Sequence, residues 1–389
     1  MKIGIITAGV LPVPAVQGGA VENLLDFCLE YNDHHTLHDI TVYSIWHPDV
    51  EKHPAQKSKV NHYRYINMNS YVAKVMKRLF KRLRKSDDYY HYSVEYFLQQ
   101  SMRHACRQPY DVIIVENRPG FVLKLTGNTS ARLVIHQEND YLNPQVRQYQ
   151  QIYDATSRII NTSAYITRCV QAIAADDTKC RTVLNGIDTQ RFYNAKPQSR
   201  EQIGLKDDDF VLVFNGRLTP EKGVLELIQA IRLLSTIPNL KLLIIGASFY
   251  GHDKTPSPFI KSLEEETRAV RNKVLFTGYI DYTDIPSYLK MADISVLPSM
   301  WEEPFGLTIA EAMAAGLPLI TTRCGGIPEI CEGVATILER DHIVEHLATS
   351  ILDLYHHPEK RERMSQASLE RSKLFDKEIY AKNYFAAIE

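Results

Sequence analysis

The sequence predicts an α/β protein of two domains, each a parallel sheet covered by helices. Three observations lead to this prediction. Short apolar runs alternate with helical patterns along both halves of the chain, as strands joined by crossover helices require. The length of 389 residues exceeds one ordinary domain and fits two of about 190. Hydrophobic residues make up 44% of the chain, which is enough to fill two cores.

The predicted strands follow one another in order, beginning with the β-branched run near the first residue. In the first half they cover residues 2–8, 40–44, 60–65, 111–116 and 132–136. In the second half they cover residues 210–215, 241–245, 274–277, 293–297 and 317–321. Between them, Lys, Gln, Asp and Pro replace the apolar runs from Asp188 to about Asp209, where we place the hinge. The predicted domains are therefore residues 1–190 and 191–372.

The most informative stretch is residues 298–326, which read PSMWEEPFGLTIAEAMAAGLPLITTRCGG. A short apolar run ends at Pro298. From Leu307 the residues are mostly Ala, Leu, Met and Glu, which favour helix, until Gly316 ends the segment. The predicted order is therefore strand, loop, helix.

Two carboxylates in this stretch, Glu303 and Glu311, stand eight positions apart. On a continuous helix they would lie roughly 12 Å apart along the axis, at ~1.5 Å per residue, so they cannot share one small substrate atom. They can hold two ends of one long ligand. The backbone amides at the start of the helix, which are free to bind phosphate, would lie between them. These amides belong to Phe305, Gly306 and Leu307.

Three further segments accompany this stretch. Residues 214–223 read FNGRLTPEKG, residues 185–188 read NGID, and residues 325–329 read GGIPE. In this combination and order the chain resembles the retaining glycosyltransferases of the GT-B fold, specifically the large family called GT4, or group 1 glycosyltransferases. The matched motifs are GRL-x-x-EKG, NG-[IV]-D and EPFG-x-x-x-x-EA with the segment that follows it.

The resemblance implies the GT-B fold, in which two Rossmann-like domains face each other across a cleft. It makes residues 1–190 the acceptor-binding domain and residues 191–372 the domain that binds the nucleotide-sugar donor. It also implies that a last helix, at residues 373–389, crosses back to the first domain.

The resemblance assigns roles to individual residues of the second domain. Arg217 and Lys222 would bind the diphosphate, to which a planar guanidinium and a compact ammonium are both suited. Glu303 would hold hydroxyls of the transferred sugar, and Glu311 would hold the two ribose hydroxyls. The nucleobase would meet backbone groups of Ile280.

Two alternative readings of the carboxylates can be weighed from the sequence. Glu302 competes with Glu303, but only Glu303 directly precedes Pro-Phe-Gly, as the motif requires. A hydrolase would use two carboxylates ~5 to 9 Å apart as acid and nucleophile. The helical separation of Glu303 and Glu311 argues against a hydrolase.

The first domain contributes three candidates. Gly18 and Gly19 follow a proline-containing loop and open a helix at residues 21–30, so the backbone there can approach a phosphate or an acceptor closely. An ordinary pair of loop glycines is the alternative.

His136 ends a predicted strand and resembles the histidine that reaches the donor sugar in many family members. A buried core or loop histidine is the alternative. With His136, the predicted catalytic set is Glu303, Arg217 and Lys222.

Composition excludes other classes. The formal net charge of −1 gives no support to nucleic-acid binding. The six cysteines form no CxxC pair. A metal-dependent transferase would place an Asp-x-Asp motif after a strand, whereas the Asp run at residues 207–209 precedes one. We therefore expect no metal and no cofactor besides the nucleotide sugar.

The first segment reads as a strand and not a signal peptide, and no run of ~18 apolar residues occurs, so a cytoplasmic location is expected.

One segment points to a partner. Residues 74–85 carry seven basic side chains and no acidic one, and apolar positions at helical spacing run from residue 72 to 83. A helix over residues 72–85 can lie on an anionic membrane surface, which would make the protein peripheral on the inner face of the membrane. The alternative is a basic solvated helix that packs its apolar stripe on the first sheet.

By this resemblance we expect a retaining, metal-independent transferase. It would move a hexose-type sugar from a nucleotide diphosphate to a glycan or lipid-linked acceptor, for a cell-envelope polysaccharide, capsule or glycolipid. A UDP-sugar is favoured as donor, with a GDP-sugar as the alternative. Two other functions stay open. One is a nucleotide-sugar epimerase of the same fold, which needs no acceptor. The other is a non-catalytic nucleotide-binding partner subunit, which would be expected to have lost Arg217, Lys222 or Glu303.

Overall fold

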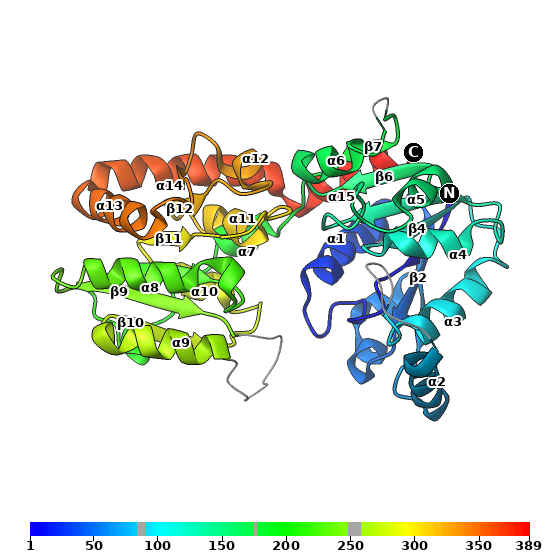
Figure 1. Cartoon of the computed structure of the whole chain (residues 1–389), viewed down its shortest axis with the longest axis horizontal. Helices are drawn as coiled ribbons and strands as arrows, with labels where there is room; N and C mark the ends of the chain where they lie inside the picture. Colours follow the sequence, from blue (N-terminus) through cyan, green and yellow to red (C-terminus); the bar gives the residue numbers. More distant parts are fainter. Residues whose placement is uncertain (84–90, 175–176, 248–257) are drawn as a thin grey trace. The chain divides into compact units, whose positions relative to one another are not determined.

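The computed structural model describes residues 1–83, 91–174, 177–247 and 258–389. It divides into two compact units (Figure 1). Unit 1 consists of Met1–Gly186 together with Lys377–Glu389, and unit 2 is Ile187–Asp376. The Arg84 and Lys85 cations of the basic segment lie outside the described residues.

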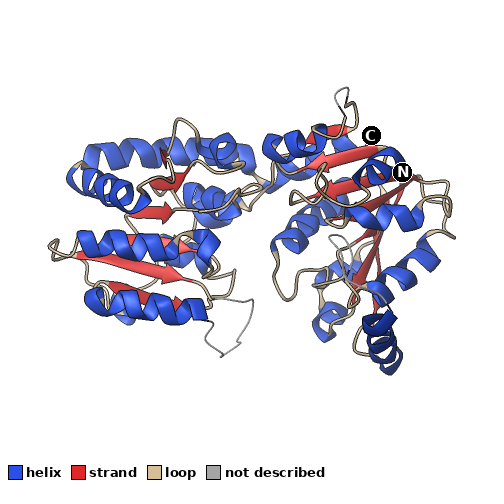
Figure 2. Ribbon diagram, viewed as in Figure 1, coloured by secondary structure: helices blue, strands red, loops and turns tan. Residues whose placement is uncertain are grey.

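Unit 1 is built on a parallel sheet that has seven strands within the described residues, in the order β3-β2-β1-β4-β5-β6-β7. Helices lie on both faces of this sheet (Figure 2). The strands are β1 Lys2–Ile6, β2 Asp39–Ile45, β3 Asn61–Ile66, β4 Val112–Glu116, β5 Arg132–Gln137, β6 Arg158–Asn161 and β7 Cys180–Thr182. The helices are α1 Ala20–His35, α2 Tyr71–Leu83, α3 Glu95–Ala105, α4 Val122–Leu125, α5 Tyr149–Ala155, α6 Ala164–Gln171 and α15 Lys377–Ile388.

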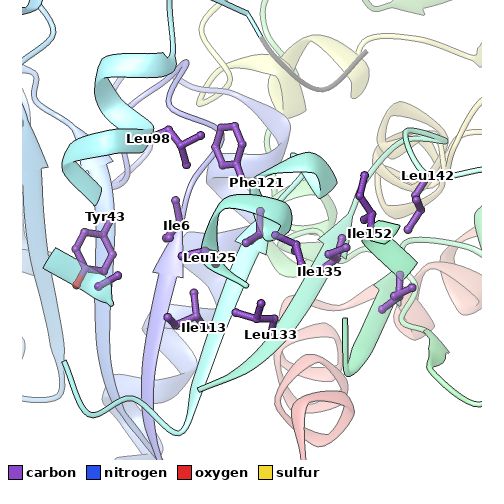
Figure 3. Close-up of a cluster of buried hydrophobic side chains, with 14 of the residues drawn as sticks. Ile6, Tyr43, Leu98, Ile113, Phe121, Leu125, Leu133, Ile135, Leu142 and Ile152 are labelled. Carbon is purple, nitrogen blue, oxygen red and sulfur yellow. The ribbon is translucent and has the colours of Figure 1, made fainter. Parts of the chain in front are cut away.

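The core of unit 1 is formed where the central strands meet the helices on one face (Figure 3). Ile113 of β4 and Ile135 of β5 are fully buried there, against Phe121 and Leu125 from the segment that follows β4. Because both faces of a parallel sheet are covered, its inner strands are apolar throughout, as the sequence VIIV of β4 illustrates.

Helix α15 completes unit 1 from the far end of the sequence. It packs on α1, and its Tyr380, Tyr384 and Phe385 are buried. Gly186, the last residue before unit 2, lies against the same helix, where an added Cβ would stand 2.5 Å from the Cβ of Tyr380. A side chain at position 186 would collide with α15. The segment that leaves unit 1 at Gly186 can therefore lie against the start of α15 only because residue 186 is a glycine.

Unit 2 repeats the plan with a parallel sheet of six strands among the residues described, in the order β10-β9-β8-β11-β12-β13. The strands are β8 Phe210–Asn215, β9 Leu240–Ile245, β10 Val274–Gly278, β11 Ile294–Leu297, β12 Leu319–Thr322 and β13 Thr336–Leu338. The helices are α7 Thr189–Tyr193, α8 Val224–Leu233, α9 Pro258–Thr267, α10 Ile285–Leu289, α11 Leu307–Ala314, α12 Ile327–Cys331, α13 Ile343–His356 and α14 Pro358–Ser372.

The predicted fold class is confirmed, since both units are doubly wound parallel sheets of the Rossmann-like kind. All ten predicted strands form. Strands β6, β7 and β13 were not predicted from the sequence. In the part of the chain that the structure describes, no helix combines the length and the apolar character needed to cross a membrane.

Candidate functional site

The strand order of unit 2 locates a site independently of any motif. Its order reverses between β8 and β11, so the loops that follow these two strands diverge and leave a crevice at the carboxyl end of the sheet. A pocket lies there. It is lined by Phe214, Asn215, Gly216, Lys222, Leu297, Ser299, Glu303, Gly306, Thr308, Ile309 and Ile327. Two of the segments singled out in the sequence, residues 214–223 and 298–326, thus supply most of its wall.

The loop after β8 is docked on the loop after β11 through a tight turn. Residues Pro220–Lys222 form a 3-10 turn that ends at Gly223 with φ 68°. The backbone amide of Met300 donates to the carbonyl of Glu221 at 2.7 Å. A Cβ at Gly223 would stand 1.9 Å from the carbonyl oxygen of Pro298, so only glycine allows this approach. The turn therefore holds Lys222 against the second loop.

Lys222 and Glu303 meet in the pocket. The Lys222 ammonium donates a hydrogen bond to Oε1 of Glu303, and the hydroxyl of Ser299 donates to the same oxygen at 2.8 Å. The ring of Trp301 lies 5.7 Å from the ammonium. Glu303 is buried, and the Lys222 side chain is 22% exposed. The pocket is therefore lined by both a cation, the Lys222 ammonium, and a hydrogen-bond acceptor, the Glu303 carboxylate.

The neighbouring glutamate is turned to the surface. Glu302 accepts hydrogen bonds from Arg340 at 2.8 Å and from the amide of Gly325 at 2.6 Å, and its side chain is 44% exposed. Glu303 is fixed through its backbone, because the amide of Gly326 donates to its carbonyl at 2.7 Å. Of the two adjacent carboxylates, it is the one that lines the pocket.

Helix α11 begins beside this pair. It follows Gly306, and no side chain caps its amino end within the described residues. The first amides of a helix have no partner inside the helix, and the helix dipole makes that end attractive to anions. Phe305 is buried, with its ring 5.7 Å from that of Phe375. Its side chain therefore belongs to the core, and only its backbone can face a ligand. Leu307, half-buried, opens the helix.

Glu311 lies four residues further along α11 than Leu307, and it is buried among polar side chains. It accepts hydrogen bonds from Asn215 at 3.3 Å and from the hydroxyl of Tyr282, and the ring of Tyr282 lies 5.1 Å from the guanidinium of Arg191. Burial raises the pKa of Glu311 to about 7, although Tyr282, Arg191 and Asn215 each favour the charged form. Its ionisation is therefore poised near neutrality.

The other two candidates of unit 2 are peripheral to this pocket. Arg217 is exposed and stands close enough to Glu221 to help lower the pKa of that carboxyl, after the larger effects of hydrogen bonds from Thr219 and from its own backbone. Ile280 is half-buried in the loop after β10. Neither lines the pocket that holds Lys222 and Glu303.

In unit 1, the Gly18-Gly19 pair does open a helix, but a carboxylate already stands at its end. Gly19 precedes α1 with φ 108°, and a Cβ on it would lie 2.2 Å from Oε2 of Glu22. Burial raises the pKa of Glu22 to about 7, against the effect of the hydrogen bond from its own amide. An anion approaching the amino end of α1 would therefore meet the Glu22 carboxyl as well as free amides. Gly18, with φ 73°, faces open space.

His136 lies in a buried chain of polar groups at the ends of β4 and β5. Its Nδ1 lies 2.7 Å from Oε2 of Glu116, and its Nε2 lies 3.2 Å from Oε1 of Glu138. The hydroxyl of Tyr384 donates to the other oxygen of Glu116 at 2.9 Å, and Asn185 donates to Glu138. Both ring nitrogens thus face carboxylates, and the His136 side chain is 3% exposed. This is the environment of the buried histidine that the sequence left open as the alternative.

This arrangement makes a prediction about stability. Burial alone would lower the pKa of His136, but Glu116 and Glu138 raise it to about 9. A raised pKa means that the imidazolium stabilises the fold fully below its unfolded value of about 6.5, and that this contribution, about 3 kcal/mol, is lost as the pH rises from 6.5 to 9. The thermal midpoint should fall across that window. Calorimetry of His136→Gln, which cannot titrate there, should show a flatter profile.

The matched control is His62→Gln, because the His62 side chain is 52% exposed. It should leave the profile unchanged. Parallel profiles for the wild type and His136→Gln would mean that the buried imidazole is not charged in the folded protein.

Several residues of these sites escaped sequence reasoning. Ser299 and Trp301 follow β11 within the stretch already singled out, and Asn215 is the last residue of β8. Their position at the carboxyl ends of these two strands was a usable signal. Tyr282 and Glu22 carried no such signal, because nothing in the sequence says which side chains turn toward Glu311 or Gly19. Among the described residues, no group of three or more His, Cys, Asp or Glu is arranged to hold a metal ion, and the metal-independent reaction stays a prediction.

Several known proteins are similar to this chain in sequence. Residues 195–371 match the family model described as "Glycosyl transferases group 1". The chain is 28% identical over 384 residues to Spore coat protein SA of Bacillus subtilis, covering 95% of this chain and 93% of that protein. It is 25% identical over 301 residues to the Lipopolysaccharide 1,2-N-acetylglucosaminetransferase of Salmonella typhimurium, covering 73% of this chain and 74% of that protein.

Among solved structures, Anabaena Alr3699/HepE in complex with UDP has the same fold. The TM-score is 0.73 and the identity 19%, with 100% of this chain and 99% of that chain covered. The same Anabaena protein has also been solved in complex with UDP-glucose, and that structure superposes with a TM-score of 0.72.

Proposed function

We propose that this chain, whose residues 195–371 match the model of the group 1 glycosyl transferases, moves a hexose from a nucleotide diphosphate sugar to a glycan or lipid-linked acceptor, with retention of the anomeric configuration and without a metal ion. The single observation that carries the proposal is the meeting of Lys222, Glu303 and the amino end of α11 in one pocket at the switch point of the unit 2 sheet.

The chemistry requires two opposite charges close together. Breaking the bond between sugar and phosphate builds negative charge on the departing diphosphate and positive charge on the sugar ring. The Lys222 ammonium and the amides of Gly306 and Leu307 present fixed positive potential to the diphosphate, with Arg217 at the exposed side. Glu303, at the same ammonium, accepts hydrogen bonds from hydroxyls of the sugar.

Glu311 holds the ribose in this proposal, and the backbone at Ile280 meets the nucleobase. Asn215 and Tyr282 orient the Glu311 carboxylate, which then accepts from two neighbouring hydroxyls. A UDP-sugar is our first choice of donor. The UDP and UDP-glucose complexes of the Anabaena protein, which shares the fold, support that choice.

Unit 1 binds the acceptor in this proposal, and His136 contributes by holding the ends of β4 and β5 in place. Gly18 and Gly19 offer backbone amides near the start of α1. The Salmonella relative is named for transfer to lipopolysaccharide, which supports an acceptor in the cell envelope, such as a polysaccharide, a capsule or a glycolipid.

The test is a thermal-shift screen of UDP, GDP, ADP and dTDP and of the corresponding sugars. A ligand at a hundred times its dissociation constant stabilises the native state by about 2.7 kcal/mol, which is easily seen as a raised midpoint. We expect UDP and a UDP-hexose to raise it. If none of the panel does, the donor site is wrongly assigned.

A second measurement separates the proposal from its alternatives. Incubating the protein with the stabilising nucleotide sugar, a chelator and a mixture of lipid-linked acceptors should release nucleoside diphosphate, and nuclear magnetic resonance should show that the sugar keeps its anomeric configuration. Conversion of the sugar without any acceptor would indicate an epimerase. Binding without turnover across acceptors would favour a non-catalytic subunit.

The raised pKa of Glu311 predicts that nucleotide-sugar binding depends on pH. If the carboxylate must be charged to hold ribose, then with a pKa of about 7 the affinity for a nucleotide sugar should be about tenfold weaker at pH 6 than at pH 8. Isothermal titration should show this. Glu311→Gln should bind weakly and without the pH dependence, and an unchanged pH profile in that variant would remove Glu311 from the binding site.

A further inference from the structure

Helix α2, Tyr71–Leu83, lies at the periphery of unit 1 beside α3 (Figure 1). It presents three faces. Ala73 and Phe80 are buried and attach it to the protein. The second face is apolar but exposed. At about 100° per residue its members fall within an arc of roughly 80° that adjoins the buried face. They are Val72 at 57%, Val75 at 43%, Leu79 at 44% and Leu83 at 69% exposure.

The third face is cationic. It consists of Lys74, Lys77, Arg78, Lys81 and Arg82, all exposed. The ammonium of Lys81 lies 5.9 Å from the ring centroid of Tyr92. As far as the structure describes the chain, no carboxylate forms an ion pair with any of these five. Tyr71, 83% exposed, falls between Arg78 and Arg82 on the side of the cationic face nearest Val75, at about 100° per residue.

The sequence left two interpretations of the basic segment, a helix on a membrane surface and a solvated helix that packs its apolar stripe on the sheet. The structure agrees with the second only in part. Its apolar stripe does not go into the core as a whole. Of its six positions, Phe80 is buried and Met76 half-buried, and the other four stay exposed beside five cations. Leaving four aliphatic side chains of one helix in water is unfavourable unless another apolar phase covers them.

We propose that α2 docks unit 1 on an anionic lipid surface. The exposed aliphatic side chains would insert at the boundary between headgroups and acyl chains; they are Val72, Val75, Leu79 and Leu83. The Lys and Arg side chains would extend toward the lipid phosphates. Tyr71 suits the headgroup layer, where amphipathic rings accumulate. A nucleic acid would match the charge but not the aliphatic face, and a second copy of the chain would match the aliphatic face but would bring five more cations against it. This inference does not depend on the transferase activity.

The charge is tested by co-sedimentation of the full chain with vesicles of phosphatidylcholine alone or mixed with phosphatidylglycerol. We expect binding only to the mixed vesicles, and release at high salt. Lys74→Gln, Lys77→Gln and Arg78→Gln together should weaken it on the order of 100-fold, from the usual contribution of each cation near an anionic surface. The matched control is Lys52→Gln, Lys57→Gln and Lys59→Gln, which removes the same charge from exposed positions of unit 1 outside α2.

The aliphatic face is tested with Val72→Gln and Leu79→Gln. Glutamine favours helix, so these substitutions remove the apolar surface without weakening the helical propensity of α2. Binding should fall, while Leu37→Gln, at a site 44% exposed like Leu79, should leave it unchanged. Leu79→Trp should show a blue-shifted fluorescence difference with mixed vesicles and none with phosphatidylcholine alone. Thermal midpoints equal to that of the wild type would show that these variants fold.

Three results would overturn the proposal. They are equal binding to neutral vesicles, equal losses in the α2 variants and their controls, and a lipid-free dimer that Leu79→Gln dissociates. Tighter binding to RNA than to the mixed vesicles would make α2 a nucleic-acid surface instead.

Discussion

Glu303→Gln should lower the turnover number for sugar transfer roughly 100- to 1000-fold, the usual cost of removing one preorganised electrostatic partner of a transition state. The substitution keeps the shape of the side chain but removes its charge at the atom that Lys222 and Ser299 both contact. A neutral amide cannot compensate positive charge developing on the sugar ring. The affinity for bare UDP should change much less, because UDP lacks the transferred hexose that residue 303 would contact.

The control for this experiment is the adjacent residue. Glu302→Gln removes the same charge one position earlier, from a side chain that is 44% exposed and paired with Arg340 at the surface. Exposed ion pairs contribute about 0–1 kcal/mol, so turnover should fall by no more than about fivefold. The comparison needs steady-state kinetics with saturating donor, and calorimetric titration of UDP. Similar losses in the two variants, or a parallel loss of UDP affinity in Glu303→Gln, would exclude the assigned role.

Gly223→Ala should be the most destabilising single substitution considered, lowering the thermal midpoint of unit 2 by more than about 10 °C. The new methyl group would stand 1.9 Å from the carbonyl oxygen of Pro298, so the turn that carries Lys222 has to leave the loop that carries Glu303. Nucleotide binding should be lost with it, even at temperatures where the variant is folded.

Gly204 separates this clash from simple backbone strain. It ends the 3-10 turn Glu201–Ile203 with φ 80° and ψ 20°, as Gly223 ends its turn with φ 68° and ψ 19°, but a Cβ there meets nothing within 4 Å. Gly204→Ala therefore measures only the cost of the left-handed conformation, about 1–2 kcal/mol, or a few degrees. Equal shifts in the two variants would mean that unit 2 relaxes freely around Pro298, and that the turn does not position Lys222.

The fold was largely predictable because long apolar strands carry their own signal. Those that the sequence missed are short. Strand β7, Cys180–Thr182, and β13, Thr336–Leu338, have three residues each and lie at sheet edges, where half-exposed sequences such as CRT or TIL resemble loops. Strand β6, Arg158–Asn161, has only four. Their pairing depends on a neighbour already in place, which no local pattern records.

The site was predictable to the level of which loops form it, and less so for what each side chain does. The resemblance assigned Lys222 to the diphosphate and Glu303 to the sugar of one ligand, and the structure adds that their segments follow the neighbouring strands β8 and β11. That Glu22 would turn back over Gly19, or that His136 would lie between two carboxylates, depends on side-chain rotamers and on residues more than a hundred positions away, such as Tyr384. Motif matching assigns roles by position and cannot see such neighbours.

The placement of α15 affects how the chain can be made. A ribosome delivers Met1–Gly186 first, then the whole of unit 2, and only afterwards the residues 377–388 that cover α1. At ~5–20 residues per second, the nascent first unit must wait roughly 10–40 s with the binding face of α1 uncovered. During that interval Cys28, which is fully buried in the finished protein and hydrogen-bonded to Tyr380 of α15, lacks that partner. Slow translation or early termination would therefore expose the first unit to chaperones and proteases while leaving the second able to fold from one continuous segment.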